Sequence, residues 1–122
     1  MKDQVLFVTG WAIGMGEAIA VLAAERGAKV IIADIDEVAA QNTADKIRAN
    51  GGEAFAVRCD VSLFDNVENA IDFCMERYGR IDAAFNNAGI QPRPQKIADL
   101  PEEEYDRVMS INLKGVYLCK KY

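Results

Sequence analysis

The chain has 122 residues, of which 51% are hydrophobic and 27% are charged, and its formal net charge is −5 at pH 7. This length suits one domain, and the hydrophobic content excludes an intrinsically disordered chain. The excess of acids, without a cluster of lysines and arginines, argues against a nucleic-acid partner. The sequence contains no histidine, which excludes histidine-based catalysis within this chain and argues against a zinc site, so no metal is expected.

The three cysteines, Cys59, Cys74 and Cys119, match no metal or redox spacing and lie in apolar stretches. We therefore expect buried, reduced thiols. No stretch approaches the ~18 apolar residues of a membrane helix, and the first residues lack the apolar segment of a signal peptide. These features predict a cytoplasmic protein with no membrane partner.

Short apolar runs alternate with helical patterns along the chain. The runs predict strands at residues 5–9, 30–33, 54–57 and 81–85. Each run is continuous rather than alternating, which is typical of parallel strands covered on both faces. The order β-α-β-α-β-α-β-α with right-handed crossovers predicts an α/β fold with three layers.

The helical patterns predict local details that the structure can test. Ser62, with Asp65 three residues later, resembles a capping box for the third helix. The fourth helix is expected to begin near Pro101, with acids in its first turn, where they favour the positive helix end. The apolar stripe of the first helix is Ile19, Leu22 and Ala23. The apolar residues expected on one side of the fourth helix are Tyr105, Val108, Met109, Leu113 and Val116.

A glycine-spaced segment, Thr9 to Gly16, follows the first strand and opens the first helix. In this setting the backbone can approach a pyrophosphate at a helix N-terminus. A glycine-rich turn without a ligand is the alternative for this segment taken alone.

An acid at the end of the second strand supports a nucleotide ligand. Asp34 lies 18 residues after Gly16, and an acid near this separation hydrogen-bonds the adenosine ribose of NAD and repels the 2′-phosphate of NADP. Ile13 offers no positive charge for that phosphate. A solvated carboxylate is the alternative for Asp34, and Asp36 is expected to cap the next helix. The predicted cofactor is therefore NAD.

The Thr-Gly-x-x-x-Gly-x-Gly spacing of residues 9–16 resembles that of the classical short-chain dehydrogenase/reductase family. Three further motifs resemble the family in the same order: Asp60-Val61, then Asn86-Asn87-Ala88-Gly89, then Asn112 in the fourth helix. The match runs from the first strand to the last residue. It implies a Rossmann-type, doubly wound parallel sheet, truncated after the fourth strand and the following helix, with residues 1–122 as one NAD-binding domain.

The resemblance implies how a dinucleotide is held. The pyrophosphate turn would consist of Gly10, Gly14, Met15 and Gly16. Asp34 would hold the adenosine ribose, Asp60 would accept from the adenine amino group, and Val61 would contribute a backbone contact. The floor beneath the ribose would be shaped by Asn86, Ala88 and Gly89, while Asn87 ties neighbouring strands together. Trp11 stands where the family has a small residue, so its ring either crowds the cofactor or lies over its outer edge.

The resemblance also implies where catalysis is incomplete. Asn112 matches the family's catalytic asparagine, which kinks its helix and holds a water of the proton relay; a polar group that satisfies backbone is a compatible alternative. The family's catalytic Ser and Tyr-x-x-x-Lys follow later, and we expect this chain to end before them. Tyr117 and Lys121 have the Tyr-x-x-x-Lys spacing but share a helix with Asn112, so Tyr117 is instead expected at a core position.

The family reaction transfers a hydride between NAD and an alcohol or ketone, and we expect this oxidoreductase portion to be inactive alone. Two alternatives are a non-catalytic NAD-binding module and an interaction protein that pairs through an exposed sheet edge. The unpaired edge of the fourth strand, and a helix that resembles a family dimer interface, predict a homo-oligomer.

Overall fold

The computed structural model describes residues 1–10 and 14–122, so the predictions for Trp11 and Ile13 lie outside the described residues. One parallel sheet has the strand order β3-β2-β1-β4. Its strands are β1 (Val5–Thr9), β2 (Lys29–Asp34), β3 (Glu53–Arg58) and β4 (Ala83–Asn86). The strand order reverses direction at β1, which confirms the doubly wound α/β prediction.

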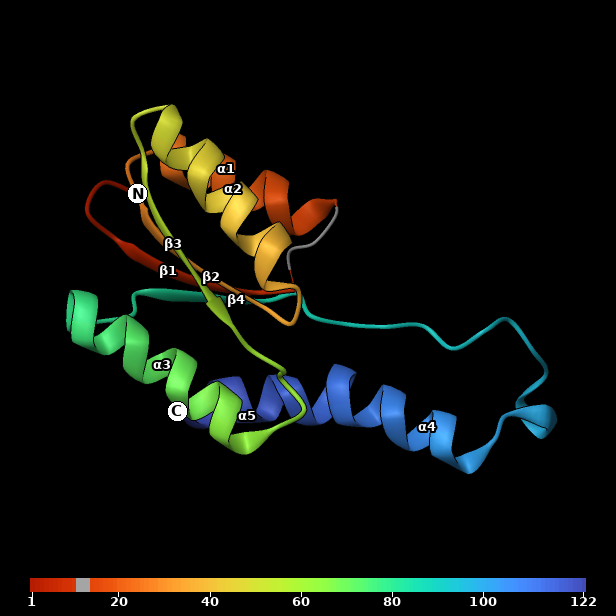
Figure 1. Ribbon diagram of the computed structural model, residues 1–122. Coiled ribbons are helices and arrows are strands. Elements are labelled where there is room, and N and C mark those ends of the chain that lie inside the picture. The colour runs from red at the N-terminus through yellow and green to blue at the C-terminus, as the bar shows by residue number, and fades with distance from the viewer. Residues whose placement is uncertain (11–13) are drawn as a thin grey trace.

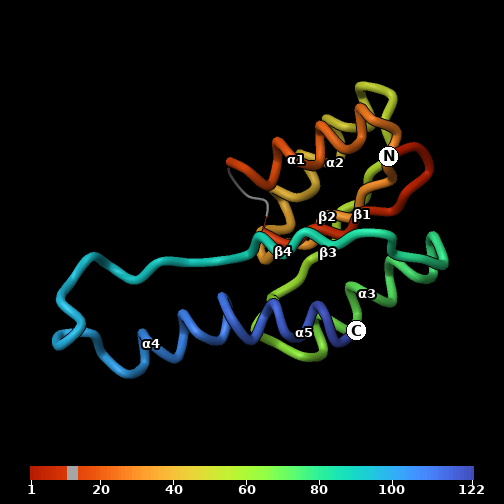
Figure 2. Tube along the Cα trace, turned by 180° about the vertical axis from the view of Figure 1, so that it is seen from behind, coloured from red at the N-terminus to blue at the C-terminus, as the bar shows by residue number. Residues whose placement is uncertain are grey.

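Helices cover both faces of this sheet, as Figures 1 and 2 show. One face carries α1 (Met15–Glu25) and α2 (Glu37–Ala49), and the other carries α3 (Phe64–Tyr78) and α5 (Gly115–Lys121). A short 3-10 turn, η1 (Ile97–Asp99), precedes α4 (Glu102–Met109), which runs through the π-helical segment η2 (Ser110–Lys114) into α5. Within the described ranges, no helix is long and apolar enough to cross a membrane, and no group of three potential ligand side chains could hold a metal.

The core has two layers because successive strand residues point to opposite faces. Leu6, Val8, Val30 and Ile32 pack against α1 and α2, whereas Val5, Phe7 and Ile31 pack against α3 and α5. Both sets are buried, which explains why the apolar runs are continuous. The three cysteines are buried and free, as predicted. Burial raises the pKa of Cys59 to about 12 and those of Cys74 and Cys119 to about 11.

Two predictions for the helix starts are confirmed and one is wrong. The Asp36 side chain caps α2 by accepting from the Ala39 amide at 3.0 Å, and α4 begins after Pro101. The capping box at α3 does not form, because Leu63 is the N-cap residue and no side chain caps the helix. The Ser62 hydroxyl instead donates to the Asp60 carboxylate, which lies closer to it along the chain.

The predicted apolar stripes are only partly buried. On α1 the buried residues are Gly16, Ala20, Ala23 and Ala24, whereas Leu22 is 46% exposed. On the last helices Leu113 and Tyr117 are 61% and 58% exposed, so the prediction of a core position for Tyr117 is wrong. Among the described residues, α4 extends past the end of α3 (Figure 1).

Candidate functional site

A cleft of about 340 Å³ opens where the parallel strands end at their carboxyl edge. In an open α/β sheet, ligands bind at this edge, at the point where the strand order reverses. The lining residues are Gly10, Asp34, Ile35, Cys59, Asp60, Val61, Asn87, Ala88, Gly89, Ile90 and Ile111. The sequence patterns predicted six of these as cofactor contacts: Gly10, Asp34, Asp60, Val61, Ala88 and Gly89.

Gly10 brings the exits of β1 and β4 into direct contact. Its φ is +76°, and a Cβ built on it would lie 2.3 Å from the Ala88 Cα atom, so only glycine fits. The Asn87 side-chain amide donates to the Gly10 carbonyl, and the Ala88 amide donates to the Thr9 hydroxyl at 3.4 Å. The expected role of Asn87 in tying neighbouring strands together agrees with this bond.

Asp34 places a carboxylate at the β2 end of the cleft. The residue is only 5% exposed, and its Oδ1 accepts from the Asp36 amide at 2.8 Å. The Cys59 amide donates to the Asp34 carbonyl at 2.8 Å, which fixes the end of β2 against the end of β3. A buried acid held by backbone in this way has a defined position at the cleft wall.

The turn after β3, Asp60–Ser62, forms the adjacent wall. Asp60 Oδ1 accepts from the Ser62 amide at 2.9 Å and from the Ser62 hydroxyl at 2.6 Å. The Asp60 amide donates to Asn66 Oδ1 at 3.2 Å. A short acidic side chain that binds the backbone two residues on stabilises a local turn, so Ser62 orients the Asp60 carboxylate.

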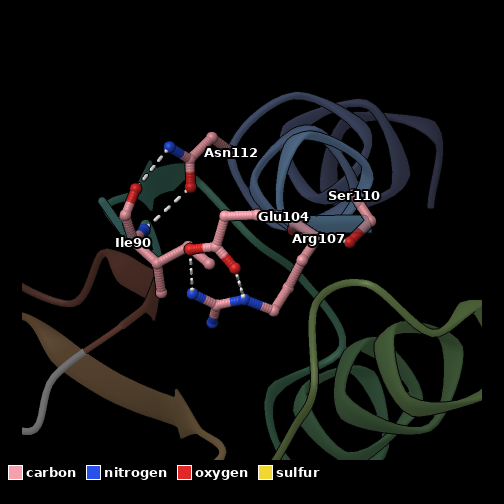
Figure 3. Close-up of polar contacts among 5 residues, drawn as sticks. All are labelled: Ile90, Glu104, Arg107, Ser110 and Asn112. Carbon is pink, nitrogen blue, oxygen red and sulfur yellow. Dashed lines mark hydrogen bonds and ion pairs between the residues drawn. The ribbon is translucent and has the colours of Figure 1, made fainter. Parts of the chain in front are cut away.

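Asn112 holds the wall after β4. Its Nδ2 donates to the Ile90 carbonyl and its Oδ1 accepts from the Ile90 amide, both at 2.8 Å (Figure 3). The residue lies within the π-helical segment η2, where the α-helical hydrogen-bond pattern is interrupted. The expected kink at Asn112 agrees with this segment, and its amide satisfies backbone, although the side chain is exposed rather than buried.

A family model described as short chain dehydrogenase matches residues 4–122. The chain belongs to the short-chain dehydrogenase family. It is 44% identical over 121 residues to the CLA biosynthesis dehydrogenase/reductase of Lactiplantibacillus plantarum, covering 98% of this chain and 42% of that protein. The chain therefore spans less than half the length of this relative.

Solved structures of short-chain dehydrogenases have the same fold. One is a 3-ketoacyl-(acyl-carrier-protein) reductase from Brucella melitensis complexed with NADH, with TM-score 0.93, 37% identity, and coverage of 98% of this chain and 48% of that one. Another is a short-chain dehydrogenase/reductase from Burkholderia phymatum in complex with NAD, with TM-score 0.94, 32% identity, and coverage of 98% and 42%.

The lining of the cleft does not include four other described residues that were expected to bind the cofactor: Gly14, Met15, Gly16 and Asn86. Gly14, with φ of 95°, begins α1 without a side-chain cap, so the first amides of that helix remain able to bind an anion. Met15 is 73% exposed and Gly16 is buried. Asn86 ends β4, and its Oδ1 is buried with no hydrogen-bond partner in the described part of the chain.

Sequence patterns missed four residues of the lining: Ile35, Cys59, Ile90 and Ile111. Ile35 and Cys59 each adjoin an acid that was identified, so the strand-end position itself was the available signal. No sequence pattern marks Ile90 or Ile111 as a cleft residue. The segment after β4 that contains Ile90 meets the helix that contains Ile111 through the Asn112 side chain, 22 residues away from Ile90.

We expect Asn112→Ala to speed exchange of the Ile90 amide hydrogen by about fivefold, because one hydrogen bond contributes about 1 kcal/mol. Amide hydrogen exchange, measured by NMR on the wild type and on Asn112→Ala, tests this. Ser110→Ala is the matched control, since the Ser110 hydroxyl donates to the Arg107 carbonyl at 2.8 Å, in the same helical region but away from Ile90 (Figure 3). Equal exchange in the wild type and Asn112→Ala would show that the Ile90 contact does not protect that amide.

Proposed function

We propose that residues 1–122 form an NAD-binding Rossmann domain, the cofactor-binding part of a short-chain dehydrogenase. The observation that carries this proposal is the buried Asp34 carboxylate, which lines the same cleft as the contact between Gly10 and Ala88. The relatives that hold NADH and NAD support a nicotinamide dinucleotide as the ligand.

The residues of the cleft fit such a ligand from end to end. Asp34 would hold the adenosine ribose, Asp60 would accept from the adenine amino group, and Val61 would contribute a backbone contact. The pyrophosphate would lie at the start of α1, along Gly10, Gly14, Met15 and Gly16. The floor beneath the ribose would be formed by Asn86, Ala88 and Gly89. The absent side chain at Gly10 lets the Ala88 backbone pack directly against Gly10, which brings together two segments that line the cleft.

Selectivity for NAD over NADP follows from charge. A 2′-phosphate placed at Asp34 would bring two negative groups together in a partly desolvated cleft, where Coulomb repulsion is stronger than in water. Ile13, which precedes Gly14 in the sequence, carries no charge and so supplies no compensating cation. We expect calorimetric titration of the chain to give at least tenfold tighter binding of NAD than of NADP. Equal affinity, or a preference for NADP, would contradict the assignment of Asp34.

For the whole enzyme we propose the family reaction, hydride transfer between the nicotinamide and an alcohol or ketone, with Asn112 as the family's catalytic asparagine. The titratable groups that line the cleft in the described part are Asp34, Cys59 and Asp60. Burial raises the pKa of Cys59 to about 12, so this thiol stays protonated at neutral pH. The two carboxylates belong to the proposed adenosine end, far from the reacting carbon.

We propose that Tyr117 and Lys121 do not act as the acid and base of the family reaction. Tyr117 lies beside Met109 and Leu113 on an exposed surface outside the cleft, and the Lys121 ammonium lies over the Phe64 ring at 5.6 Å. A positioned acid or base increases the reaction rate by about 10²–10⁴-fold. We therefore expect this chain not to oxidise secondary alcohols, and an assay that follows the absorbance of NADH tests this. Turnover that disappears in Tyr117→Phe would overturn this proposal.

We also propose that the chain self-associates. The β4 strand pairs with β1 alone among the described strands, and an unpaired strand edge favours association with another chain. The exposed apolar side chains of Leu113 and Tyr117 lie on one surface with the half-buried Met109. Light scattering is expected to show a mass above the monomer that rises with concentration, whereas a monomer at every concentration would contradict the proposal.

A further inference from the structure

One short helical segment contacts both walls of the cleft. Asn112 in η2 binds Ile90, in the wall after β4. Two residues further on, the Lys114 ammonium donates to the Ser62 carbonyl at 3.0 Å, in the wall after β3. The next residue, Gly115, packs against Val61. Residues 112–115 of the helix therefore connect the segment after β4 with the turn after β3, which lie far apart in the sequence.

The contact at Gly115 leaves no room for a side chain. A Cβ built on Gly115 would lie 2.7 Å from Val61 Cγ2 and 3.1 Å from Val61 Cβ. Both residues are buried. The helix backbone therefore rests directly on Val61, and any added atom at Gly115 must displace the turn after β3 or the helix itself.

The contact at Lys114 leads by hydrogen bonds to the Asp60 carboxylate. Lys114 binds the carbonyl of Ser62, and the amide and hydroxyl of the same Ser62 donate to Asp60 Oδ1 at 2.9 and 2.6 Å. All the hydrogen bonds that the Asp60 side chain accepts from the described residues end on Oδ1. The position of Ser62 thus decides where Oδ2 points, and Oδ2 is able to accept from a ligand.

We propose that Lys114 and Gly115 are positioning residues for adenine recognition, which hold the Asp60–Ser62 turn so that Asp60 meets the exocyclic amino group of adenine. This inference rests on the proposed function, since it takes an adenine dinucleotide as the ligand. Lys114 and Gly115 act through Asp60 and Val61 and do not themselves line the cleft. Because Asn112 belongs to the same segment, the adenine wall and the Ile90 contact are set by one structural element.

The test compares NAD with nicotinamide hypoxanthine dinucleotide, in which a carbonyl oxygen replaces the adenine amino group. With the analogue, Asp60 would face an acceptor instead of a donor, so we expect the wild-type chain to bind NAD about tenfold more tightly. In Lys114→Met this preference is expected to fall to about twofold or less. Loss of stability alone would weaken both dinucleotides equally and leave their ratio unchanged.

Two variants control the Lys114 experiment. Lys114→Arg keeps a cationic donor for the Ser62 carbonyl and is expected to retain the preference for NAD. Lys120→Met removes an exposed lysine on the same helix, outside the contacts to the cleft walls, and is also expected to retain it. Circular dichroism confirms that each variant is folded before titration.

The Gly115 contact is tested by a double-mutant cycle. Gly115→Ala is expected to reduce the preference for NAD, because the added Cβ displaces Val61. Val61→Ala removes the Cγ2 atom that this Cβ would meet at 2.7 Å, so the double variant is expected to regain part of the preference, a non-additive result.

The outcomes separate this inference from the proposed function. A tenfold preference for NAD that persists in both Lys114→Met and Gly115→Ala would overturn the inference and leave NAD binding intact. A wild-type chain that binds both dinucleotides equally would also overturn it, since Asp60 would then not distinguish the adenine amino group from a carbonyl oxygen. A wild-type chain that binds neither would contradict the proposed function, and the inference with it.

Discussion

Gly10→Ala is expected to lower the free energy of unfolding by about 2–5 kcal/mol. The positive φ of Gly10 costs an L-residue about 1–2 kcal/mol, and overpacking adds about 1–3 kcal/mol. The atom that the new Cβ meets at 2.3 Å is the Ala88 Cα, and backbone cannot move aside as a flexible side chain would. Urea unfolding followed by circular dichroism measures the difference.

Gly51→Ala is the matched control for this change. Gly51 also has a positive φ, +83°, but a Cβ built on it meets no atom within 4 Å. Gly51→Ala should therefore lower the free energy of unfolding only by the cost of the positive φ, about 1–2 kcal/mol. If the two variants lost the same stability, the close contact between the β1 and β4 exits would not be a determinant of this fold.

Asp34→Ala is expected to weaken NAD binding by about 10- to 100-fold, because a hydrogen bond to a charged group contributes about 1.5–3 kcal/mol. The same change should bring the affinities for NAD and NADP close together, since the repulsion of the 2′-phosphate disappears with the carboxylate. Isothermal titration of both cofactors against the wild type and the variant provides the measurement.

Asp36→Ala controls for the loss of an acid near the same strand end. Asp36 caps α2 through the Ala39 amide, so its removal should cost about 1 kcal/mol of stability and leave NAD affinity unchanged. A loss of NAD affinity in Asp36→Ala as large as in Asp34→Ala would show that general damage to this region, rather than the ribose contact, lowers the affinity.

The fold was predictable because its signals are local. Continuous apolar runs, such as residues 5–9, mark strands that are buried on both faces, and the glycines after α2 and α3 mark helix ends. Asp34 was predicted from its place at a strand end, 18 residues after Gly16, and Asp60 from the resemblance to the family. Both line the cleft, because parallel strands bring their carboxyl ends to one edge. A position at a strand end therefore predicts a position in the cleft.

What could not be predicted depends on contacts between distant segments. Helical periodicity placed Leu22 and Leu113 on apolar faces, but it does not show whether another element covers a face, and both side chains are exposed. Ile90 belongs to the cleft through its bonds to Asn112. Ser62 had the spacing of a helix cap, yet its hydroxyl bonds Asp60, because a turn two residues away competes with the helix start.

The central claim, that the cleft at the carboxyl edge of the sheet binds NAD, is tested most directly by amide chemical shifts during an NAD titration. We expect saturable changes at Gly10, Asp34, Ile35, Asp60, Val61 and Ala88 to Ile90. Gly51 and Gly52, which line a separate pocket between the ends of α1 and α2, should not change. Saturable shifts confined to Gly51 and Gly52, or no saturable shift at all, would contradict the account.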